Sequence, residues 1–259
     1  MLKSGLAEQD RRYLYNYMHF GRFSRTTAVE VLAAQFDEYI AMGSEVKSEL
    51  NEPSPNQKGK LLAIKIYAEF FAAMEDLGAL CLAIRDRKKT GFLCKLLTYH
   101  NKQIADFYRI FGKQTFESGL RLPRAEKLSD KALGMPPTVL RQSYEVCTQH
   151  MRQVAVMFND QTELRKAFNK SKHGFTMVDD QNLLRPGTDE VIELDQARAL
   201  IWDSQSEDHE GCAAGRPVLI PFGDARGLVV KARENVAILQ GTIGEVCLTL
   251  LILADRQLI

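Results

Sequence analysis

The sequence predicts a mainly α protein, an up-and-down bundle of four to five long helices with a small β-hairpin or sheet inserted before the last helix. Two observations predict it. Apolar residues recur at three- and four-residue steps along several long stretches, and a shorter region of apolar runs between turn residues precedes the last of them. No composition change marks a boundary, so we expect residues 1–259 to form one domain.

The first helix is expected over residues 27–50, where one apolar stripe faces a core. This stripe consists of Val29, Leu32, Phe36, Tyr39, Gly43, Val46 and Leu50. The segment 51–60, NEPSPNQKGK, is rich in Pro, Asn and Gly and is therefore expected to be a loop.

The second helix is expected over residues 61–85. Ala72, Ala79 and Ala83 fall on one strip, where small side chains would let another helix approach closely. This helix should therefore lie at the centre of the bundle. The charged segment 86–91, DRKKTG, is expected to end it.

A third helical region is expected over residues 92–111, followed by a long connection over 111–137 with room for one short helix. The fourth helix should begin after Pro136-Pro137, and its stripe is the cleanest in the chain. The stripe consists of Leu140, Tyr144, Cys147, Met151, Val154 and Phe158.

A short helix is expected to start at Asp160, because Glu163 follows at the spacing of a capping box, and to reach Gly174. The β insertion is expected over about 175–223, where short strand-like runs such as RPVLIPF alternate with turns. The last helix should cover about 225–256, and its second half is apolar nearly all round. We expect that half to be buried in the bundle or in an oligomer contact.

The composition argues against several classes of protein. The net charge of +1 gives no global attraction to nucleic acid or to anionic membrane. The five cysteines form no CxxC pair, which favours a reducing cytoplasm over a disulfide framework or a zinc site. The longest apolar run, 246–254, is too short to span a bilayer, so membrane insertion is not expected.

The segment 164–175, LRKAFNKSKHGF, carries the candidate chemistry. On a helical wheel Leu164, Phe168 and Phe175 face the core, whereas a polar set faces away from it. That polar set consists of Lys166, Asn169, Lys170 and His173. Two interpretations remain open: a solvated helix face, or a site at which His173 acts as general acid or base on an RNA 2′-hydroxyl while a cation offsets the phosphate charge.

A helical bundle whose late helix carries Asn169, His173 and a terminal KHG resembles the HEPN-like superfamily. The resemblance implies bundles that dimerise and, in many members, metal-independent ribonucleases of toxin–antitoxin or phage-defence systems. The family motif is an Arg, then four to six residues, then His. His173 matches the His, but the permitted Arg positions, 166–168, hold Lys, Ala and Phe. Lys replaces the charge of Arg without its bidentate geometry, which favours a non-catalytic member.

The leading hypothesis is therefore a binding or interaction module of HEPN-like type in a defence-associated setting, with a homodimer and an RNA or protein partner implied. The alternative is a metal-independent endoribonuclease at a dimer cleft. In that alternative His173, Asn169 and Lys166 are catalytic, and Lys170, Arg165 and Lys172 bind phosphate. We expect no metal and no cofactor.

Two further sets of residues have weaker predictions. Glu69, Glu75 and Asp76 are expected to pair with bases across the bundle. His150 flanks the stripe of the fourth helix and is expected to be a half-buried packing residue. No phosphate-binding or nucleophile-elbow motif occurs in the chain.

Overall fold

The computed structural model describes residues 6–42, 55–160, 183–184, 191–192, 198–203, 216–221 and 225–259. The structure is mainly helical, as predicted. The chain divides into two compact units. The larger comprises the described residues of 1–29, 69–160 and 234–259, and the smaller comprises those of 30–68 and 161–233.

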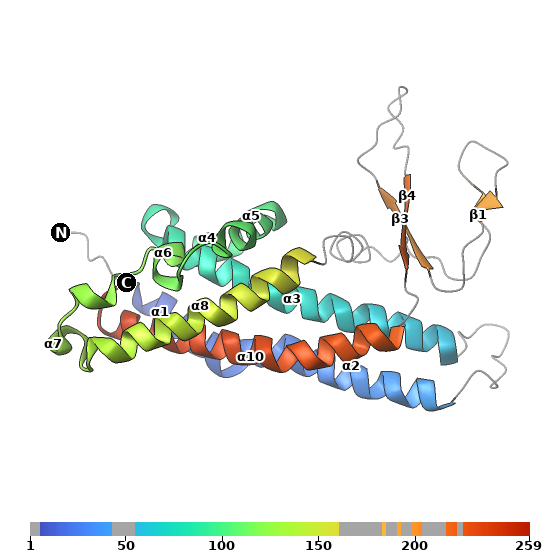
Figure 1. Cartoon of the computed structure of the whole chain (residues 1–259), viewed down its shortest axis with the longest axis horizontal. Helices are drawn as coiled ribbons and strands as arrows, with labels where there is room; N and C mark the ends of the chain where they lie inside the picture. The colour runs from blue at the N-terminus through green and yellow to red at the C-terminus, as the bar shows by residue number, and fades with distance from the viewer. Residues whose placement is uncertain are drawn as a thin grey trace, which may run out of the picture. The chain divides into compact units, whose positions relative to one another are not determined.

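Helices dominate both units (Figure 1). They are α1 (Glu8–Asn16), the π-helical turn η1 (Tyr17–Gly21), α2 (Arg22–Met42), α3 (Pro55–Thr90), α4 (Phe92–Leu97), α5 (Asn101–Phe111), α6 (Phe116–Leu120), the 3-10 turn η2 (Ala125–Lys127), α7 (Asp130–Leu133), α8 (Pro137–Asp160) and α10 (Ala225–Asp255).

The described residues of the smaller unit include four short strands. Strand β1 (Leu183–Leu184) pairs antiparallel with β2 (Val191–Ile192), and β3 (Arg198–Asp203) pairs antiparallel with β4 (Arg216–Pro221). Most of the chain between α8 and α10 lies outside the described residues. The β insertion over about 175–223 and the single domain over 1–259 therefore stay predictions.

The stripe predicted for the fourth helix is confirmed in α8. All six of its residues, from Leu140 to Phe158, are buried. The last helix is confirmed as α10, and its second half is buried over most of its surface, as expected. These two helices have the longest regular apolar patterns, which is the condition under which periodicity predicts best.

Two predicted breaks are wrong. Residues 55–60 belong to α3, because Pro55 occupies the first helical position, where its missing N–H costs nothing. Residues 86–90 also belong to α3, because Arg and Lys have a high intrinsic helix propensity. The helix ends only at Gly91, whose φ of 73° excludes helical continuation.

Three other boundaries differ from expectation. The sequence patterns missed α1, and α2 begins at Arg22 rather than at about residue 27. The third helical region is two helices, α4 and α5, separated at residues 98–100. The long connection holds α6, η2 and α7, all of five residues or fewer. Such short elements carry too few residues to show a period.

The core of the larger unit is built around α3. The ring of Phe158 on α8 contacts Phe71 of α3 and Tyr108 of α5, at centroid distances of 6.5 and 4.7 Å. The Tyr108 hydroxyl donates a 2.7 Å hydrogen bond to the carbonyl oxygen of Met74. Tyr108 thus fills the core and also satisfies its own buried polar atom.

Helix α8 runs beside the C-terminal half of α10 (yellow-green and red in Figure 1). The two ends of the described chain also meet, because the backbone N–H of Leu6 donates to the carbonyl oxygen of Ile259 at 2.7 Å. The start of α1 is thereby held close to the end of α10 within the larger unit.

The smaller unit joins the C-terminal part of α2 to the start of α3. Phe36 and Ile40 lie over Gly59, where an added Cβ would come within 3.4 Å of Ile40. The carboxylate of Asp37 forms an ion pair with the guanidinium of Arg233 of α10, at 2.6 Å. Both contacts lie within this unit.

We predict opposite effects of two Gly→Ala substitutions in helices of the larger unit. At Gly78 of α3 a Cβ would lie 2.8 Å from Ile104 and 3.0 Å from Tyr108 of α5, so Gly78→Ala should destabilise by about 1–3 kcal/mol through overpacking. Gly241 of α10 is exposed and has nothing within 4 Å. Gly241→Ala should stabilise by up to about 1 kcal/mol through helix propensity.

Urea denaturation measured by circular dichroism checks both Gly→Ala variants against the wild-type chain. Gly241→Ala is the matched control, because it makes the same chemical change in a helix without a neighbouring side chain. Equal changes of the same sign at both positions would contradict the close approach of α3 and α5 at Gly78.

Candidate functional site

The segment 164–175 lies outside the described residues. This applies to every residue of the predicted acid–base and phosphate sites, namely Arg165, Lys166, Asn169, Lys170, Lys172 and His173. Their roles therefore stay predictions. The functional arrangements described below come from other parts of the chain.

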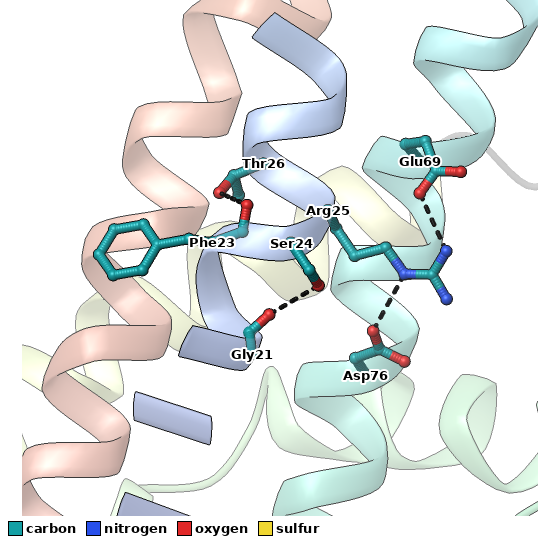
Figure 2. Close-up of polar contacts among 7 residues, drawn as sticks. All are labelled: Gly21, Phe23, Ser24, Arg25, Thr26, Glu69 and Asp76. Carbon is teal, nitrogen blue, oxygen red and sulfur yellow. Dashed lines mark hydrogen bonds and ion pairs between the residues drawn. The ribbon is translucent and has the colours of Figure 1, made fainter. Parts of the chain in front are cut away.

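An ion-pair cluster joins α2 to α3 in the larger unit (Figure 2). The Arg25 guanidinium donates from Nη1 to Glu69 at 2.9 Å and from Nε to Asp76 at 3.3 Å. Glu69 and Asp76 are seven residues apart and therefore lie two turns apart on one face of α3. The prediction that these carboxylates pair with a base across the bundle is confirmed for both of them.

The chain reaches Arg25 through the π-helical turn η1. An added Cβ on Gly21 would meet the ring of Tyr17 at 2.6 Å, so this turn needs a glycine. The Ser24 hydroxyl donates to the Gly21 carbonyl at 2.8 Å (Figure 2) and satisfies a backbone acceptor that the wider turn exposes. The first turn of α2, which carries Arg25, is fixed in this way.

The Arg25 cluster holds α2 against α3 and is not suited to proton transfer. Although partial burial alone would lower the pKa of Arg25, the hydrogen bonds and charges of Glu69 and Asp76 raise it. Burial raises the pKa of the nearby Tyr99, and the charge of Asp76 raises it further. A permanently charged Arg and a permanently neutral Tyr offer no group that titrates near neutral pH.

A second polar pair joins α8 to α10. Nδ1 of His150 lies 2.7 Å from a carboxylate oxygen of Glu245. His150 is half-buried, as predicted. Its partner lies 95 residues away, and no sequence pattern indicates this pairing. A carboxylate that orients an imidazole is the arrangement of a general base, provided that a substrate reaches the other ring nitrogen.

Cys147, one turn before His150 on α8, does not complete a nucleophilic site. Its thiol is buried and lies 3.6 Å from the Thr249 hydroxyl. Burial raises the pKa of Cys147 to about 11, against a smaller lowering by the hydrogen bond to Thr249. The thiolate, which is the reactive form, is therefore scarce at neutral pH.

A cation cluster surrounds Asp86 near the C-terminal end of α3. Arg85 donates two hydrogen bonds to the Asp86 carboxylate, at 3.1 and 3.0 Å, and Arg121 lies 3.8 Å from it. Partial burial alone would raise the pKa of Asp86. The hydrogen bond and charge of Arg85, with the charges of Arg121 and Lys95, lower it instead. One carboxylate therefore faces three cations from three segments of the chain.

Arg87 adds a fourth cation at the same end of α3. Its Nη1 donates to the Ile84 carbonyl at 2.6 Å, and its Nε is buried without a hydrogen-bond partner. Burial lowers the pKa of this guanidinium. We name Arg85, Arg87, Lys95 and Arg121 the α3-end cluster. A count of charges over residues 85–131, rather than over the whole chain, would have revealed it.

A groove of about 640 Å³ lies between α1, η1 and the end of α10 in the larger unit. We name it the α1–α10 groove. Its apolar lining includes Tyr15 and Leu248, which are 55% and 52% exposed. The half-buried Met18 and Ile252 and the buried Leu251 also line it. Its volume is in the range of ligand and peptide sites, and five of its ten lining residues are apolar.

Four charged residues also line the α1–α10 groove. Arg12 and Glu8 form an exposed ion pair at 2.6 Å. Arg11 and Asp255 carry opposite charges, but no ion pair joins them to each other or to another described residue. Nε of Arg11 is moreover buried without a hydrogen-bond partner. The groove therefore holds a cation and an anion that are both unpaired among the described residues.

One helix in the described part of the chain, over Arg226–Asp255 of α10, is long and apolar enough to cross a membrane by length and composition. More than half of its most apolar window is buried within the structure. The core helix of a soluble protein meets the same criterion, so this feature is weak evidence for a membrane span. The absence of membrane insertion stays a prediction.

We predict a sharp difference in reactivity among the four described cysteines. Cys94 is exposed, whereas Cys81, Cys147 and Cys247 are buried. With a pKa of about 11, Cys147 would hold only about one ten-thousandth of its thiol as thiolate near pH 7. Iodoacetamide should therefore label Cys94 first in the native chain, as measured by mass spectrometry of peptides.

The control for the labelling experiment is the urea-denatured chain, in which all of these cysteines should react at similar rates. Native labelling of Cys147 at the rate of Cys94 would contradict the burial of its thiol. It would also reopen a nucleophilic site beside His150 and Glu245.

Comparisons with family models, with curated proteins and with solved structures find no match for this chain. The argument for function therefore rests on the surfaces of the chain itself. Among the described residues these surfaces are the α1–α10 groove, the α3-end cluster and the His150–Glu245 pair.

Proposed function

We propose that this chain is a helical-bundle interaction module of HEPN-like type that self-associates through the α1–α10 groove. The observation that carries the proposal is a pair of opposite charges in one groove, Arg11 and Asp255, for which the described residues supply no ion-pair partner. The sequence resemblance supports the HEPN-like assignment and the defence-associated setting.

The apolar lining supplies the driving force for association. Single exposed apolar residues are normal on protein surfaces. In this groove, however, Tyr15 and Leu248 are exposed beside three further apolar side chains. A contiguous apolar surface with a charged rim is typical of an interaction site.

The charges of the α1–α10 groove favour a second copy of the chain as the occupant. Two cations and two carboxylates line it, so the groove is neutral and does not repel itself. A two-fold contact presents the same patch from both sides. Arg11 of one copy would then meet Asp255 of the other, and both charges would gain a partner that the described residues of their own copy do not supply.

We expect the wild-type chain to form a dimer that Leu248→Asp weakens at least about tenfold, because the substitution places a charge in the apolar contact. Sedimentation velocity over a range of concentrations measures the effect. Val156→Asp is the matched control, since Val156 is exposed to a similar degree on α8 but does not line the groove. It should leave the dimer unchanged.

Charge reversal tests the pairing itself. Arg11→Glu and Asp255→Arg should each weaken self-association, because each places like charges opposite one another. An equimolar mixture of the two variants should restore a heterodimer, since both pairs are then of opposite sign again. A monomeric wild-type chain, or no recovery on mixing, would overturn the proposal.

The alternative function is a metal-independent endoribonuclease with His173, Asn169 and Lys166 as its catalytic residues. Its support is the sequence pattern, because an imidazole beside an amide and a cation suits proton transfer at a phosphodiester. Cleavage of RNA in EDTA should be lost in His173→Ala. Equal activity of both chains, or none in either, would exclude it.

The proposal includes the predicted β insertion over about 175–223 as part of the same module and places the protein in the cytoplasm. It needs no metal or cofactor, because the groove recognises its partner by apolar and ionic contacts. A protein partner other than a second copy would use the same contacts and would appear as binding without self-association.

A further inference from the structure

Positive charge is concentrated in one stretch of the chain. Residues 85–131 hold twelve Lys and Arg against five Asp and Glu, a net charge of +7, although the whole chain carries only +1. The remainder is therefore net acidic, at −6. A polyanion that meets this protein should bind at the basic stretch and be repelled elsewhere.

The helix dipole explains only part of this concentration. Cations in the last turns of α3 face the negative end of its dipole, which accounts for Arg85 and Arg87 without any ligand. Lys95 belongs to α4 and Arg121 follows α6, so neither serves the end of α3 in this way. Both nevertheless act on Asp86, as Arg85 does, so three cations face one carboxylate.

The backbone of Arg121 is a second, independent observation. Arg121 caps α6 in the left-handed conformation, with φ at 55°, and its N–H donates to the Ser118 carbonyl while that of Leu122 donates to Glu117. Glycine is the usual residue at this position of a helix end. An arginine there accepts backbone strain, which is typical of residues whose side chains have a function.

We propose that the α3-end cluster binds the phosphodiester backbone of a single-stranded nucleic acid. Asp86 lies between Arg85 and Arg121 in the way that a phosphate would, and its single charge does not balance theirs together with that of Lys95. Arg recognises phosphate through paired N–H donors. Cations on separate short elements suit a flexible backbone that can follow them.

The same cluster fits an anionic bilayer less well. Proteins that bind in the bilayer interface bury a row of apolar side chains next to their cations. Near Lys95, the six-residue helix α4 exposes Leu97, but its Phe92 is buried. One exposed leucine makes no such row, so nucleic acid is the ligand that the cluster favours.

Fluorescence anisotropy with labelled mixed-sequence RNA and DNA of about 20 nucleotides, at about 50–200 mM salt, tests the proposal. We expect wild-type affinity to fall steeply with salt for both probes. Arg121→Gly should bind several-fold to about tenfold more weakly, with a shallower salt dependence. The same variant should unfold at an equal or higher temperature, because glycine adopts this φ without strain.

The variant panel separates binding from folding. Arg121→Lys should keep part of the affinity, since lysine retains the positive charge but lacks the paired N–H donors of the guanidinium. Lys95→Ala should weaken both probes alike, because it removes a charge and no base contact. Arg141→Ala is the control: Arg141 lies outside residues 85–131, is exposed and is paired with Glu145 at 3.9 Å, so its loss should change affinity less than twofold.

Several outcomes would overturn the inference. They are no binding of either oligonucleotide by the wild-type chain, equal affinities for wild type, Arg121→Gly and Lys95→Ala, or binding to phosphatidylserine vesicles without binding to the oligonucleotides. A higher affinity for one of the two probes would identify whether RNA or DNA is the preferred nucleic acid. The inference does not depend on self-association, because sedimentation and anisotropy report separately on the groove and on the cluster.

Discussion

The burial of α3 is the constraint on which the rest of the structure depends. Every residue from Phe70 to Ile84 except Asp76 is buried, and Glu75 and Asp76 are the only charged residues in this stretch. The other charged residues of α3 lie outside it. Arg25 pairs with Glu69 just before the stretch and with Asp76 within it, and the run from Arg85 follows it. The α3-end cluster therefore lies where the central helix first reaches water.

Net charge conceals this arrangement. A chain with a charge of +1 has no global attraction to a polyanion, yet one stretch of it carries +7. The two surfaces use charge in opposite ways. The α1–α10 groove balances cations with carboxylates, which permits contact with an identical surface. The α3-end cluster sets three cations around one carboxylate and would repel its own copy. Electrostatics thus gives each surface a different class of partner.

Periodicity predicted the long helices well, because one side of each faces the core. Two helix boundaries were predicted wrongly, because residues usually found in loops lie inside α3. Pro55 begins this helix, and the run of cations after Arg85 continues it instead of breaking it. The ion pairs of Glu69 and Asp76 were partly predictable, since carboxylates beside a buried helix need bases. The ion pair of Asp86 and Arg121 was not predictable, because 35 residues separate the two and only the fold brings them together. The predicted His173 site lies outside the described residues and stays a prediction.

Self-association through the groove would also increase the affinity of the α3-end cluster for a polyanion. The residues that line the groove and those of the α3-end cluster do not overlap, and both surfaces belong to the larger unit. Self-association through the groove would therefore leave the cluster open and place two copies of it on one particle. A flexible polyanion that reaches both clusters binds the second one intramolecularly, at a high effective concentration, and gains avidity without any new contact. Four modest cations per chain then suffice for stable binding, since neither cluster alone has to supply the whole affinity.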